Sequence, residues 1–448
     1  MRKTDDNAIV NGPIGKQLVL FLVPVWLGLM FQQLYNTVDT LIVGQFVGTN
    51  AVAAVGNVAF VVQLIIGMCA GIANGAGVII SQHYGAEKHE QVKIDIRCSL
   101  VIAVAGGLIF SVLGVAVSEM SVRLLNTPGE IVADSVTYLQ VYFWALIPAL
   151  IYNFGTAILR GMGDSRRPLY VLIVASVVNI VLDLLFVVVF NWGVFGVAFA
   201  TDIAQIVSAV MVMVLLIRAQ PGALKGSIKY PVVYRNIFRI GIPTAVQSMM
   251  YSFSNLLVQA AVNSFGTAVI AAWTIYGKVD CLNWMTTSAM GTAVTAFAGQ
   301  NFGAGRYDRV KKCARLGNLY LGAAVLVIVI VLYVGAYPLF EFFSNDAQVV
   351  QLGAEQMRFL TPAYLLYFPV EVLTGSLRGC GDVKIPTIVS IIGTCLVRML
   401  WIAFVVPVWN TMEAVMMCYV VSWTLVTGFF IVYFAKAKWM ERCIAGKA

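Results

Sequence analysis

The sequence is an almost unbroken series of apolar runs, each about as long as a membrane is thick. A helix needs about 20 predominantly apolar residues to cross the hydrocarbon core of a bilayer. Runs of that kind lie at 17–43, 51–79, 95–117, 132–158, 169–189, 193–217, 237–262, 268–297, 314–340, 349–375, 386–408 and 411–437. The sequence therefore predicts an all-α polytopic membrane protein with twelve transmembrane helices.

The composition supports a chain whose outer surface faces lipid. Of its 448 residues, 60% are hydrophobic and 11% are charged, whereas about a quarter of the residues of a typical soluble protein are charged. The first 16 residues are polar and lack the short apolar core of a signal peptide, and the run that follows is too long to be one. We expect that run to stay in place as a helix.

The basic residues indicate which side of the membrane each gap faces. Of the 29 Lys and Arg side chains, 25 lie in the N-terminal segment, in the gaps after the even-numbered runs, in the C-terminal tail, or at the run ends beside them. An excess of Lys and Arg marks the cytoplasmic side. We therefore expect both termini to be cytoplasmic in the cell (inner) membrane, and we ascribe the net charge of +8 to topology rather than to nucleic-acid binding.

The two halves of the chain match at a constant offset of 218 residues. The segment 81–86 (SQHYGA) lies opposite 299–304 (GQNFGA), and 159–164 (LRGMGD) lies opposite 377–382 (LRGCGD). Each half contains six runs, an even number, so the two copies have the same orientation. Parallel repeats of this kind are one architecture of secondary transporters, whose substrate site lies near the bilayer midplane.

The repeat gives the predicted domain organisation. We expect a cytoplasmic N-terminus at 1–16, an N-lobe at 17–217, a cytoplasmic linker at 218–236, a C-lobe at 237–437 and a cytoplasmic tail at 438–448. The matched loops are interpreted as structural. Gly85 and Gly303 can end helices in the left-handed conformation, as glycine often does.

Several polar side chains fall inside the apolar runs, where an unpaired charge costs several kcal/mol and is a functional candidate. Asp39 lies late in the first run. Asp183 lies four residues after Asn179, so the two share a helical face, and Thr201 and Asp202 lie in the next run. Carboxylate, amide and hydroxyl oxygens suit a hard cation such as Na⁺. A carboxylate removed from water can instead take up a proton, so the pattern leaves both H⁺ and Na⁺ open.

The second half has its own charged residues within the runs. Lys278, Arg358 and Arg398 are expected to be internal ion partners or to extend to the membrane interface. No GxxxxGK[ST] phosphate loop is present, and no cytoplasmic gap is long enough to fold a nucleotide-binding domain. We therefore expect no nucleotide, no cofactor and no catalysis, and an ion gradient as the energy source.

At this point a family resemblance emerges. The stretch 32–39 (QQLYNTVD), the paired LRGxGD segments, the QxxGA loops and the segment 179–183 (NIVLD) resemble the multidrug and toxic-compound extrusion (MATE) transporters. The resemblance covers about residues 13–435. It implies a fold of two six-helix lobes, and a multidrug efflux antiporter that exports cationic amphipathic compounds (drugs and dyes) in exchange for H⁺ or Na⁺.

The resemblance also implies site residues, most closely those of the prokaryotic type with an acidic N-lobe site. Asp39, Asn179, Asp183 and Thr201 match its cation site, and Pro24 matches a proline associated with bending of the first helix. Contacts with the organic substrate are expected from six residues: Gln32, Tyr35, Asn36, Asn153, Tyr251 and Glu371. The seventh run carries no carboxylate, unlike another branch of the family, so Glu371 is expected to contact substrate rather than a second ion. The protein is expected to be a monomer.

The sequence favours two alternative functions less. A lipid-linked oligosaccharide or lipid flippase of a related two-lobe family would need a basic cavity for pyrophosphate, whereas the charges within the first-half runs are mostly acidic. An integral membrane enzyme would need clustered His or an Asp-rich motif, and His83 and His89 are the two histidines of this sequence.

Overall fold

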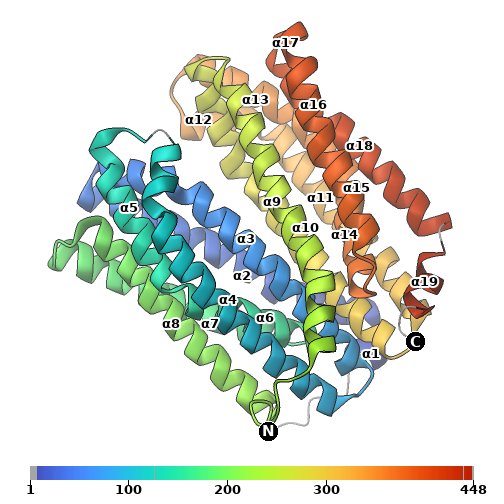
Figure 1. Cartoon of the computed structure of the whole chain (residues 1–448). Helices are drawn as coiled ribbons and strands as arrows, with labels where there is room; N and C mark the ends of the chain where they lie inside the picture. Colours follow the sequence, from blue (N-terminus) through green and yellow to red (C-terminus); the bar gives the residue numbers. More distant parts are fainter. Residues whose placement is uncertain (1–7, 126, 437, 446–448) are drawn as a thin grey trace. The chain divides into compact units, whose positions relative to one another are not determined.

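Helices form nearly all of the described chain, as the apolar runs predict. The computed structural model describes residues 8–125, 127–436 and 438–445, and no strand occurs within them. Parts of the predicted N-terminus (1–16) and tail (438–448) therefore lie outside the described residues, as does the last residue of the run at 411–437. Figure 1 shows the helices in the order of the sequence.

The first half of the chain contains the helices that match the first six apolar runs. They are α2 (Ile14–Ile42), η1 (Val43–Val47), α3 (Thr49–Gly85), α4 (His89–Leu124), α5 (Gly129–Trp144), α6 (Leu146–Gly161), α7 (Arg166–Asp183), η2 (Leu184–Val189) and α8 (Gly193–Ala219), preceded by the short α1 (Ala8–Asn11).

The second half repeats the pattern with more interruptions. Its helices are α9 (Pro231–Asn263), α10 (Thr267–Gly303), α11 (Tyr307–Val334), α12 (Ala336–Phe343), α13 (Ala347–Leu360), η3 (Thr361–Ala363), α14 (Tyr364–Gly379), α15 (Lys384–Ser390), η4 (Ile391–Leu396), α16 (Val397–Phe404), α17 (Val406–Trp409), α18 (Met412–Lys436) and α19 (Trp439–Ala445).

By length and apolarity, eight of the described helices could each cross a membrane, or nine spans if α5 and α6 form one. These two helices are bent by 54° at Ala145. The remaining three predicted runs correspond to α9, α10 and the pair α13 and α14. The helices α9 and α10 have 33 and 37 residues, so they are long enough but not apolar enough. The helices α13 and α14 have 14 and 16 residues, so each alone is shorter than the eight spans.

The chain divides into two compact units. The unit that we call the N-unit contains residues 20–245, and the C-unit contains the residues before 20 and those from 246 onward. The early residues group with the C-unit because Arg309 at the start of α11 donates to the carbonyls of Ile9 and Gly12, at 3.0 and 2.7 Å. The units therefore differ at their edges from the predicted lobes.

The LRGxGD segments are helix ends that also serve packing. Gly163 and Gly381 have φ values of 92° and 90°. The Asp164 N–H donates to the Leu159 carbonyl, and the Asp382 N–H to that of Leu377, at 2.9 and 3.0 Å. This is the hydrogen bonding of a Schellman helix end, which favours glycine at the left-handed position.

The first glycine of each LRGxGD segment lets two helices approach closely. A Cβ at Gly161 of α6 would lie 2.6 Å from the Gly77 carbonyl oxygen of α3, and one at Gly379 of α14 would lie 2.6 Å from the Thr295 carbonyl oxygen of α10. Small residues are typical of close helix packing in membranes. The repeated motif is therefore explained by structure, as the sequence indicated.

The prediction that Gly85 and Gly303 take the left-handed conformation is wrong. These glycines are the last helical residues of α3 and α10, and the left-handed residues lie two positions later, at Glu87 (φ 58°) and Gly305 (φ 73°). The reason is that the hydrogen bonds that end each helix extend past the glycine. The Lys88 N–H donates to the His83 carbonyl at 3.0 Å, and the Arg306 N–H donates to the Asn301 carbonyl at 2.8 Å.

Candidate functional site

Two carboxylates of the N-unit lie at the points where an α-helix widens into a π-helix. Asp39 lies in the last turn of α2, just before η1, and Asp183 is the last residue of α7, just before η2. The segments η1 and η2 also contact each other. Single π-helical turns in α-helices occur often at functional sites, because they turn side chains away from the regular helical positions.

The carboxyl groups of Asp39 and Asp183 adjoin each other. The charge of Asp39 acts on the Asp183 carboxyl group. A hydrogen bond between two carboxyl groups requires a proton on one of them, because an ionised carboxylate only accepts. The Asp183 side chain is fully buried. The arrangement is therefore suited to hold a proton, or a small cation, between two negative groups.

The amide and the hydroxyl predicted for the cation site lie beside each other on α7 and α8. The Asn179 Nδ2 group donates to the Thr201 hydroxyl at 3.4 Å, and both side chains are buried. Within the described chain, the Asn179 carbonyl oxygen, Asp39 Oδ1 and both Asp183 oxygens have no hydrogen-bond partner. Buried oxygens of this kind are normally paired, so these four acceptors fit a proton or Na⁺.

Three tyrosines adjoin the acidic pair. Tyr35 of α2 lies near Thr201, and the charges of Asp39 and Asp183 act on its hydroxyl. The same two charges act on Tyr138 of α5. Tyr142, one helical turn further along, stacks on Tyr138 with ring centroids 6.2 Å apart. The site thus has an aromatic wall next to its acids.

Sequence reasoning missed part of this wall. Tyr138 and Tyr142 were not predicted as site residues, although their spacing of four places them on one face of a helix. Asp202 of α8 also belongs to this region, because its charge acts on Tyr142. Its Oδ1 atom is buried without a hydrogen-bond partner in the described chain.

The predicted substrate residues fall in both units. In the N-unit, Gln32 and Asn36 are exposed side chains of α2, and the Asn153 amide of α6 donates to the Ala149 carbonyl at 2.8 Å. In the C-unit, Tyr251 of α9 bonds to Tyr367, whose hydroxyl donates to Glu371 Oε1 at 3.0 Å. Glu371 is thus held by neutral donors rather than by an ion pair.

Pro24 lies inside α2, which remains helical on both sides of it. Proline has no N–H, so the Leu20 carbonyl lacks its usual helical donor. The boundary between the two units falls at that residue, between Val19 and Leu20. The predicted hinge therefore lies close to the place where the chain passes from one unit to the other.

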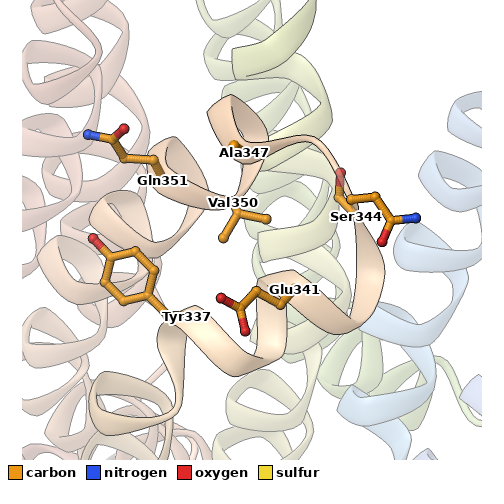
Figure 2. Close-up of a pocket in the computed structure, with 7 residues that line it drawn as sticks. Tyr337, Glu341, Ser344, Ala347, Val350 and Gln351 are labelled. Atoms are coloured by element: carbon orange, nitrogen blue, oxygen red, sulfur yellow. The ribbon is translucent and has the colours of Figure 1, made fainter.

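A hollow of about 600 Å³ lies elsewhere, between α12 and α13 of the C-unit. Figure 2 shows Tyr337 and Glu341 of α12 facing Val350 of α13 across it. None of the residues predicted from the sequence lines this hollow.

Comparisons with known proteins agree with the repeat. The model of the MatE family matches residues 24–185 and 243–403, one stretch in each half. The probable multidrug resistance protein YoeA of Bacillus subtilis is 29% identical over 391 residues, with 84% of each chain covered. The multidrug export protein MepA of Staphylococcus aureus (strain MSSA476) is 22% identical, with 93% of this chain and 91% of that protein covered.

Solved structures share the fold across the whole chain. A MOP superfamily transporter from Pyrococcus furiosus has a TM-score of 0.89 at 21% identity, with both chains fully covered. An outward-facing multidrug resistance transporter of the same superfamily has a TM-score of 0.87 at 20% identity, with 99% of each chain covered. At these identities the likeness establishes the two-repeat helical architecture.

Proposed function

Because the chain belongs to the MatE family, we propose that it is a multidrug antiporter that exports cationic amphipathic compounds in exchange for H⁺ or Na⁺ by alternating access. The observation that carries the proposal is the adjoining pair Asp39 and Asp183, which have buried oxygens without hydrogen-bond partners in the described chain. A pair of acids in a membrane interior needs a positive partner. The exchange of one positive partner for another is the chemistry of an antiporter.

The proposed cycle follows from charge. With the N-unit site open to the outside, Asp39 and Asp183 take up H⁺ or Na⁺, which neutralises the negative charge that attracts an organic cation. The organic cation leaves, the protein changes to its inward-facing state, and the ion is released to the cytoplasm. The restored charge then favours a new organic cation, whose positive group can also rest on the faces of tyrosines such as Tyr35 and Tyr138.

Either ion can be accommodated by the oxygens of the site. A proton would be shared between the two carboxyl groups. Na⁺ would be bound by carboxylate, amide and hydroxyl oxygens from Asp39, Asp183, Asn179 and Thr201, which are ligands suited to a hard cation. These residues fit both H⁺ and Na⁺, and the experiment below distinguishes the two ions.

The test uses the full chain in proteoliposomes that contain ethidium, a cationic dye. A gradient of H⁺ or of Na⁺ is imposed in separate experiments with the membrane potential clamped. We expect one of the gradients to drive dye movement opposite to the ion. We also expect the same ion to weaken equilibrium binding of ethidium to purified protein, because it occupies the same acids. Dye movement that neither gradient drives, or ethidium binding indifferent to both ions, would contradict the proposal.

A further inference from the structure

The C-unit contains a buried arginine for which the sequence interpretation is wrong. Arg398 was expected to be an internal ion partner or to extend to the interface. Its side chain is 3% exposed, and it forms no ion pair within 4 Å in the described part of the chain. A guanidinium in a membrane interior is costly without a partner, so its surroundings need an explanation.

Arg398 is held by aromatic faces and one hydroxyl. Its Cζ atom lies 4.1 Å from the ring centroid of Tyr419 and 5.7 Å from that of Trp423. Its Nε group donates to the Ser422 hydroxyl at 3.2 Å. The two terminal Nη groups have no hydrogen-bond acceptor among the described residues. Aromatic faces stabilise the charge, but they leave these donors unused.

A second unused donor lies next to the guanidinium. The Nε1 group of Trp423 is buried, and it has no hydrogen-bond partner in the described chain. The Trp423 side chain is 2% exposed. Buried N–H groups are almost always paired, so one cluster contains unused donors on both a guanidinium and an indole. Figure 1 shows α16 and α18, which carry Arg398 and Trp423 and pack against each other.

Two acids of the C-unit, Asp280 and Glu371, are engaged with neutral donors. Asp280 accepts from the Tyr364 hydroxyl at 2.5 Å and from the Trp284 Nε1 group at 2.8 Å. Glu371 accepts from Tyr367. The cluster of Arg398, Tyr419, Ser422 and Trp423 therefore provides donors and a positive charge, and within the described residues no carboxylate pairs with that charge.

The backbone next to Arg398 has the same irregularity as the N-unit acids. The π-helix η4 ends at Leu396, and Arg398 is the second residue of α16. The 218-residue offset pairs Arg398 with Ile180, and Trp423 with Gln205. The matching positions of the N-unit therefore lack this cluster, and the cluster is not a copy of the N-unit site.

We propose that Arg398 and Trp423 form a carboxylate-binding subsite in the C-unit, which accepts the acidic group of an exported planar aromatic compound. The Nη groups of an arginine match the two oxygens of a carboxylate, and Trp423 Nε1 supplies a further donor. The aromatic faces of Tyr419 and Trp423 suit the ring that carries the acid. The subsite rests on the proposed export function for the source of its ligand, and it assigns the recognition of an acidic group to these two side chains.

The test compares two dyes that differ by one ester. Rhodamine B carries a free carboxylate and a delocalised cation, and in rhodamine B ethyl ester the carboxylate is blocked. Binding of each dye to the purified full chain is measured by fluorescence anisotropy in nanodiscs, without an ion gradient. We expect Arg398→Gln to weaken rhodamine B binding by about 10- to 100-fold, the range for a hydrogen bond to a charged group. Binding of the ester should change by less than about twofold, which also shows that the variant is folded.

Two further variants secure the interpretation. Trp423→Phe keeps the ring and removes the N–H, so it should weaken rhodamine B several-fold and leave the ester unchanged. Arg358→Gln is the matched control, because Arg358 also lies over tyrosine, 4.7 Å from the Tyr337 ring centroid; it should affect neither dye. Sodium benzoate, but not sodium chloride, should displace rhodamine B, which distinguishes an aromatic acid from an inorganic anion.

Three results would overturn the subsite: no binding of rhodamine B by the unmodified protein, an equal loss of both dyes in Arg398→Gln, or equal displacement by chloride. Failure of the proposed function would be seen in another experiment, as the absence of gradient-driven ethidium transport. That result would not change the relative binding of rhodamine B and its ester.

Discussion

At the residue scale, the acids of the N-unit are expected to carry the coupling. Asp39→Asn or Asp183→Asn should reduce gradient-driven ethidium efflux to the level of empty liposomes, because an amide removes the negative charge that both the ion and the dye require. The measurement is dye efflux from proteoliposomes, with the amount of inserted protein checked. Glu119→Gln is the control, since Glu119 is exposed and pairs with Arg123. Normal efflux in both Asp variants would remove these acids from the mechanism.

The sequence predicted the acids better than it predicted their surroundings. Asp39 and Asp183 were identified because a charge in an apolar run is conspicuous, and the structure brings them together. Tyr138 and Tyr142 were missed because tyrosine is common in apolar runs and its hydroxyl gives no signal of its own. Arg398 was misjudged because the sequence does not show whether a charge has found a partner.

At the element scale, the glycines of the LRGxGD segments are expected to control stability. Gly161→Ala should destabilise the protein by about 1–3 kcal/mol, the usual cost of overpacking, because its Cβ would meet the Gly77 carbonyl. Gly379→Ala should do the same against Thr295. Gly56→Ala is the control, since it lies in α3 with no atom within 4 Å of the added Cβ. Thermal unfolding of the purified protein measures the effect, and equal stability of Gly56→Ala and Gly161→Ala would contradict it.

The proline inside α2 gives a second prediction at this scale. Pro24→Ala restores an N–H for the Leu20 carbonyl and should stiffen the helix, so transport should slow several-fold while equilibrium ethidium binding changes by less than about twofold. Pro168→Ala is the matched control, because Pro168 lies in the first turn of α7, where an N–H has no helical partner. An unchanged rate in Pro24→Ala would exclude a role for this proline in movement.

The limits of each helix were predictable to different degrees. Long apolar runs set the existence of the helices, and matched glycines such as Gly48 and Gly266, with φ values of 118° and 95°, set where two of them begin. The break at Ala145 and the π-helices η1, η2 and η4 left no periodic signal, because one extra residue in a turn barely changes the composition of a run. These irregular places are where the candidate sites lie.

At the scale of the whole molecule, the distribution of basic residues predicts the topology. A green fluorescent protein fused after Lys436 should fluoresce, and alkaline phosphatase fused at the same place should be inactive, because the tail is expected to be cytoplasmic. Phosphatase fused after Thr127, in the gap between α4 and α5, should be active, since that gap faces outward in the predicted topology. The opposite pattern of activities would invert the assignment and the proposed direction of export.

The chain passes between its two units at two points, between Val19 and Leu20 in α2 and between Ala245 and Val246 in α9. Both points lie inside continuous helices, and each is close to a proline, Pro24 or Pro243. No slack loop separates the units, so a rotation of one of them has to be absorbed as curvature of these two rods. A continuous helix resists bending more than a loop does, so the elasticity of α2 and α9 would oppose such a rotation.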